Sequence, residues 1–160
     1  MSKTFIALGE PKPLATDTGD EITNIPFFPN IRLSQVREVQ RLDGTVTPPR
    51  LRHAVVEAMA SANAELANWA DQQKSRGVRS LDAVPAEVIG GGSIHVMRYC
   101  RAVYCFAAAN LVERLRHFDS THKGHDDADK LEMNIGELLR DARHALNDIM
   151  GKTRCTVALL

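Results

Sequence analysis

Apolar residues recur every three or four positions along most of the chain, and this spacing restricts the fold more than any other feature. The clearest case starts at Thr47-Pro48 and runs to a stop near Gly77. Thr47 suits a helix N-cap, and Pro48 suits the first helical position, where its missing N–H does no harm. We therefore expect a long amphipathic helix whose buried stripe is Leu51, Val55, Ala58, Met59, Ala62, Leu66 and Trp69.

Three other segments share this helical period. The segment that follows Ser93 has two adjacent apolar stripes, which predict the most buried helix of the domain. The last one stops at Gly151, a typical residue after a helix C-terminus. A short segment that starts at Ser34, a possible N-cap, precedes the long helix. The fold class is therefore all-α, a small antiparallel helical bundle over 34–150, with helices expected at 34–42, 47–76, 93–118 and 126–150.

A connector over residues 77–92 separates two of these helices. Residues 80–84 are expected to form one helical turn before Pro85. The run Gly90-Gly91-Gly92 is expected to act as a flexible hinge rather than as a phosphate-binding loop, because it fits neither glycine motif for nucleotides.

Residues 1–33 are expected to form an extended N-terminal arm. Four of the seven prolines lie here, and proline removes backbone donors and fixes φ, so no long helix can form. Apolar residues cluster at 5–8 and 25–29. Phe27 and Phe28 either pack onto their own domain or lie along a neighbouring subunit, and we take them as candidate subunit contacts.

Residues 151–160 are expected to form an extended C-terminal tail. The segment is rich in β-branched residues, too short for a helix of its own, and ends in Leu159-Leu160. Exposed apolar residues at a chain end favour a surface on which to lie. The tail either folds back onto its own domain or adds to a partner as a strand or a hook.

Composition excludes several classes of protein. The chain has 20 basic and 20 acidic residues, which argues against binding to nucleic acid mainly through phosphate neutralisation. It has no apolar run long enough for a membrane span and no signal-peptide layout, so a cytoplasmic location is expected. Three cysteines do not make a disulfide framework.

We find no catalytic, cofactor-binding or metal-binding residues. His117, His122 and His125 are the densest set of possible metal ligands, but they straddle a loop and lack the i, i+4 pair of a helical zinc site. Cys100 and Cys105 lie on or near an apolar helix face, where cysteine acts as a small hydrophobe. The sequence therefore predicts no enzyme and no cofactor.

An alternative is a small helical DNA-binding regulatory module. Residues 50–53, Arg-Leu-Arg-His, have the composition of a short recognition helix. However, they open a helix much longer than the second helix of a helix-turn-helix unit. This alternative stays secondary.

Several short motifs, in order and over almost the whole chain, resemble the head-completion (head-stabilisation) proteins of P-two-like tailed phages. None of the motifs is diagnostic alone, but together they are specific. His144, the run at 90–92 and the loop at 119–125 depart from the pattern of this family. The residues that carry the resemblance are Phe27-Phe28-Pro29, Arg41 to Pro48, Arg50 to Ala54, Asn63 to Leu66 with Trp69, Tyr99 to Cys105, Arg140 to Arg143, Ile149, Gly151 and Thr156-Val157.

The resemblance implies a structural virion protein assembled in the bacterial host cytoplasm. Such proteins join the head after DNA packaging, sit on the portal protein as a ring, expected to be a dodecamer, and form the part of the neck to which a tail-side neck or tail-terminator protein attaches. Packaged DNA would pass through the ring without sequence-specific binding. The implied portal contacts are Thr153, Arg154, Thr156, Val157, Leu159 and Leu160; the candidate subunit contacts are Arg52, Arg98, Arg101, Arg114, Phe27 and Phe28.

Overall fold

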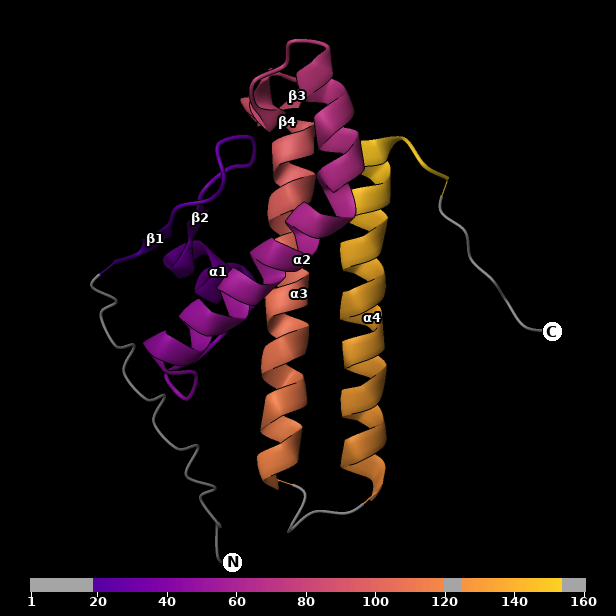
Figure 1. The fold of residues 1–160 in the computed structure, drawn as a ribbon. Coiled ribbons are helices and arrows are strands. Elements are labelled where there is room, and N and C mark those ends of the chain that lie inside the picture. The colour runs from indigo at the N-terminus through magenta and orange to yellow at the C-terminus, as the bar shows by residue number, and fades with distance from the viewer. Residues whose placement is uncertain (1–18, 120–124, 154–160) are drawn as a thin grey trace, which may run out of the picture.

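The chain folds around three long helices, which confirms the all-α class (Figure 1). The structure, a computed structural model, describes residues 19–119 and 125–153, with the side chains of 115–133 excepted. In chain order the elements are β1 (Glu21–Ile22), β2 (Ile31–Arg32), α1 (Leu33–Val39), α2 (Pro48–Ser75), a 3-10 turn η1 (Leu81–Ala83), β3 (Val88–Ile89), β4 (Gly92–Ser93), α3 (Ile94–Asp119) and α4 (His125–Met150).

Helix α3 lies at the centre of the bundle, as its two apolar stripes predict. It runs antiparallel beside α4, and α2 crosses it obliquely (Figure 1). Tyr99, Ala102, Val103 and Ala107 of α3 are fully buried. The small side chains among them let α2 and α4 approach α3 closely, so α3 contacts both of the other long helices.

Helix α2 buries the stripe that the sequence predicts, with one difference. Leu51, Val55 and Leu66 are fully buried against the bundle. Trp69, expected in the core, is only partly buried; its ring packs edge-on against Phe27, 6.4 Å away, and His95, 6.0 Å away. The indole therefore closes the rim of the core rather than filling its centre.

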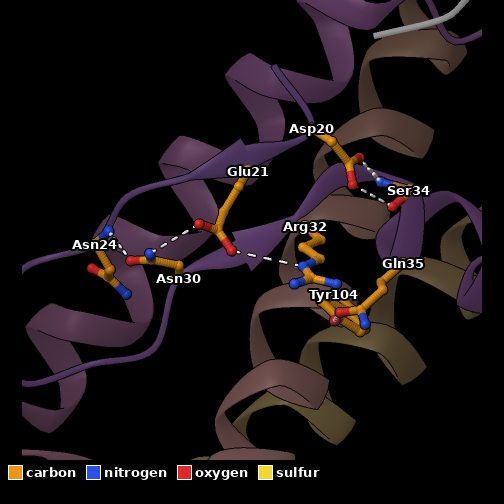
Figure 2. A network of polar contacts seen from close by, with 8 residues as sticks. All are labelled: Asp20, Glu21, Asn24, Asn30, Arg32, Ser34, Gln35 and Tyr104. Carbon is orange, nitrogen blue, oxygen red and sulfur yellow. Dashed lines mark hydrogen bonds and ion pairs between the residues drawn. The ribbon is translucent and has the colours of Figure 1, made fainter. Parts of the chain in front are cut away.

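Residues 19–32, expected as part of the arm, fold back onto the helices instead. β1 and β2 pair antiparallel, with Ile22 opposite Ile31. The Asp20 carboxylate accepts hydrogen bonds from Ser34 N–H (2.7 Å) and Ser34 Oγ (2.6 Å), and these bonds lower the pKa of Asp20 (Figure 2). Ser34 is therefore not an N-cap: Arg32 holds that position and α1 begins at Leu33.

Phe27 and Phe28 lie in the core of their own chain, which corrects their assignment as subunit contacts. Their exposed fractions are 3% and 5%. Phe28 stacks on Tyr99 with ring centroids 5.0 Å apart and planes 10° apart. The hairpin brings both rings over the bundle, where apolar surface is removed from water without a second subunit.

A closed set of hydrogen bonds fixes this hairpin loop to two helices. Tyr99 Oη donates to Asn63 Oδ1 (2.6 Å) and accepts from Asn24 Nδ2 (2.8 Å). Asn63 Nδ2 donates to Asn24 Oδ1 (2.9 Å), which completes the triangle. Three residues far apart in the sequence are thus joined, one each from the loop, α2 and α3.

The glycine run forms a tight turn, not the expected hinge. β3 and β4 pair antiparallel, with Ile89 opposite Gly92, so that Gly90 and Gly91 make a two-residue connection. Their φ angles are +59° and +84°. Two successive positive φ angles are typical of hairpin turns that match the twist of the strands, and glycine adopts them without strain.

We expect Tyr99→Phe to lower the free energy of unfolding by about 1–3 kcal/mol, because it removes the donor to the half-buried Asn63 Oδ1 and one of the two acceptors of Asn24 Nδ2. Tyr104→Phe is the matched control. Its hydroxyl contacts Gln35 Oε1, at 3.3 Å, and the Cys100 thiol, which is a weak hydrogen-bonding group, so its loss should cost less than about 1 kcal/mol. Urea denaturation measures both. Equal losses of unfolding free energy in the two variants would show that the triangle stabilises the fold no more than an ordinary hydrogen bond does.

The same tyrosines predict a loss of stability at alkaline pH. Burial raises the pKa of Tyr99 above its ordinary value and that of Tyr104 to about 12, whereas an unfolded tyrosine titrates near 10. Above pH of about 10 the unfolded chain releases protons that the folded chain retains, so stability falls as pH rises toward 12. Urea midpoints between pH 9 and 12 should fall less steeply in Tyr99→Phe than in the wild type; identical slopes would contradict this.

Candidate functional site

The described chain leaves the bundle at the C-terminal end of α4. Gly151 adopts a φ of +67°, and Lys152 N–H donates to the Asn147 carbonyl (2.9 Å), so the helix stops where the sequence predicts. Thr153 is exposed at this end. The other candidate portal contacts lie outside the described residues: Arg154, Thr156, Val157, Leu159 and Leu160.

Exposed apolar side chains gather at the same end. Val88 and Ile89 in β3 are 72% and 51% exposed, and Met97 of α3, beside the hairpin turn, is 39% exposed. Because α3 and α4 are antiparallel, the start of α3 lies next to the end of α4 (Figure 1). Unpaired apolar surface of this kind marks contact sites. One sequence signal could have identified this surface: two β-branched residues directly precede three glycines.

Two of the candidate subunit arginines face α4 of their own chain. Arg98 Nε lies 3.9 Å from Asp148 Oδ2, and Arg101 Nη2 lies 3.3 Å from Asp141 Oδ2. The Arg101 side chain is still 65% exposed, so the pairing leaves most of its guanidinium open to solvent. The two pairs border a cavity of about 360 Å³ between α3 and α4.

The other two candidate arginines lie elsewhere. Arg52 donates to the Gly19 carbonyl, 3.5 Å away, where the described chain begins. Arg114 lines a mostly apolar hollow of about 410 Å³ with Arg50 and His53, between the start of α2 and α3. The four arginines therefore do not form one surface; they divide among three places.

A groove that the sequence analysis did not identify lies between α2, α3 and α4. Its volume is about 320 Å³. Acidic side chains from α2 and α3 line it above an apolar floor that includes Phe106 and Leu139. On the sequence these acids look like ordinary solvent-facing charges, because only the crossing of α2 over α3 brings them together. The acids are Glu57, Glu65 and Glu113.

The described residues offer little for catalysis. Burial raises the pKa of the Cys100 and Cys105 thiols, so neither is an activated thiolate. No three histidine, cysteine or acidic side chains meet in metal-binding geometry anywhere in the described part of the chain. His117, His122 and His125 lie outside the described side chains. Among the described helices, none has the length and apolar character that crossing a membrane requires.

Comparison with known proteins identifies the family. Residues 22–160 match the family model "Phage head completion protein (GPL)". The chain is 46% identical over 142 residues to the head completion/stabilization protein of Escherichia phage P2, covering 88% of this chain and 84% of that protein. It is 24% identical over 139 residues to the probable head completion/stabilization protein of Haemophilus phage HP1 (strain HP1c1), covering 87% and 91%. No solved structure matches. The chain belongs to the phage head completion protein (GPL) family.

Proposed function

We propose that this head completion protein is an adaptor that binds the portal protein as a ring after DNA packaging. Its C-terminal segment would make the portal contact, and the ring would present the surface to which a tail-side neck or tail-terminator protein attaches. Packaged DNA would pass through the ring without sequence-specific contacts. Assembly would take place in the cytoplasm of the bacterial host.

The coarser part of this function follows from the family. The chain is a phage head completion/stabilisation protein, a structural component of the virion and not an enzyme. The DNA-binding alternative has no observation in its favour beyond the composition of residues 50–53. Leu51 is fully buried in the core, so this stretch is an ordinary amphipathic turn of α2.

One observation supports the portal contact most. The described core extends from Ile22 to Ile149, and it includes the apolar residues of the N-terminal hairpin. α4 ends at Met150, and exposed Val88 and Ile89 lie at the same end of the bundle. The described body thus has a core of its own without residues 156–160, and we assign the apolar residues of that segment to the partner.

Repetition around a ring would strengthen such a contact. A short segment buries little area and binds weakly alone, but copies joined in one ring bind a multimeric portal with a high effective concentration. A portal ring and an adaptor ring of matching symmetry would therefore hold together without a large interface per subunit.

We expect a chain that ends at residue 152 to keep its helicity and melting temperature but to lose binding to the portal ring. Co-sedimentation with the purified cognate portal measures this; the full chain should bind at about one copy per portal subunit. Replacement of Thr156, Val157, Leu159 and Leu160 by serine keeps the length of the tail and should act like the truncation. Cys155→Ser is the matched control and should bind as the wild type does. A truncated chain that still binds the portal would refute the tail contact.

A further inference from the structure

A closed ring requires two different surfaces on each subunit, one for each neighbour. We propose that the acidic groove of one copy receives the arginine face of the next copy. The acidic groove is the hollow lined by Glu57, Glu65 and Glu113. The arginine face is the opposite surface of the bundle, formed by Val39, Met97, Arg98, Arg101 and Arg140. This inference rests on the ring of the proposed function and names the surfaces that close it.

The two surfaces lie on opposite sides of α3. Residues nine positions apart on a helix are two and a half turns apart and point in opposite directions. Met97 of the arginine face and Phe106 of the groove are nine apart. Tyr104, beside the arginine face, and Glu113 of the groove are also nine apart.

Helix α4 shows the same division. Ile135 and Leu139 contribute to the groove, whereas His144 and Asp148 border the cavity beside Arg98 and Arg101. Ile135 and His144 are nine positions apart, and so are Leu139 and Asp148. Helices α3 and α4 thus each contribute residues to both surfaces, one on either side of the bundle. This is the arrangement that head-to-tail contact between neighbours requires.

The charges of the two surfaces are complementary. On the arginine face, Arg101 and Arg140 both approach the single carboxylate of Asp141, at 3.3 and 3.6 Å, and Arg98 pairs with Asp148. Three guanidinium groups therefore meet two carboxylates. In the groove, three glutamates meet one cation, Arg143. One surface has a surplus of positive charge and the other a surplus of negative charge.

The apolar groups of the two surfaces also match. The arginine face presents the exposed side chains of Val39 and Met97, which suit the floor formed by Phe106, Ile135 and Leu139.

Charge reversal with exchange tests the pairing on full-length protein loaded onto the portal ring. The groove variant is Glu57→Lys with Glu65→Lys, and the face variant is Arg101→Glu with Arg140→Glu; all four side chains are exposed. Each variant alone should load without cooperativity and need roughly tenfold more protein for half-occupancy. An equal mixture of the two should restore cooperative loading, because each reversed surface then meets its complement. Asp71→Lys with Asp82→Lys, exposed and outside both surfaces, is the matched control and should load as the wild type does.

Two outcomes would overturn the inference without touching portal binding: a groove variant that loads as cooperatively as the wild type, or a mixture that restores nothing. Circular dichroism and melting temperature show that each variant is folded. Failure of the wild type to bind the portal would instead overturn the proposed function. In that case sedimentation of the protein alone at raised concentration decides the pairing. If self-association is lost in each variant and returns in the mixture, the pairing of groove and arginine face is supported. If the protein does not self-associate, or if the charge reversals leave self-association unchanged, the pairing is overturned.

Discussion

A small, partly buried polar triangle at the edge of the apolar core is the interaction on which the rest of the fold depends. The Tyr99 hydroxyl donates one hydrogen bond to Asn63 and accepts one from Asn24, and the Asn63 amide donates to Asn24. Each of these side-chain polar atoms therefore has a partner. Such a network is stable only when all members are present together. It therefore specifies a single position for the hairpin loop on α2 and α3, where apolar packing alone would allow several.

This constraint determines where the outer surfaces lie. With the loop covering one side of the α2–α3 crossing, Phe27 and Phe28 are buried and cannot serve a partner. The other side of the crossing is left open as the acidic groove, between α2 and α4. The far surface of α3 and α4 carries the arginines, and the end of the bundle carries the C-terminal segment. A rigid body with three distinct outer surfaces suits a component that joins neighbours and a portal at once.

Much of the fold could be predicted because it follows from local patterns. The stripe that contains Val55 and Leu66 predicts α2, and Gly151 predicts the end of α4. The β1–β2 hairpin could not be predicted from local patterns. Phe28 contacts Tyr99, which is far away in the sequence, and the prolines next to Phe28 indicate an extended chain. The acidic groove escaped detection for a related reason: spacing along one helix does not show which acids a second helix will bring together. Interaction surfaces depend on such crossings more than core stripes do.

In the proposed function, the protein binds the portal as an already folded body, through its outer surfaces and its C-terminal segment. Hydrogen exchange of the full chain, free and on the portal ring, is the sharpest test of this proposal. We expect unchanged protection for the buried turns of α2 and α3 around Asn63 and Tyr99, and new protection for residues 151–160. Loss of protection at residues 22–31 on binding, or no gain at 151–160, would contradict it.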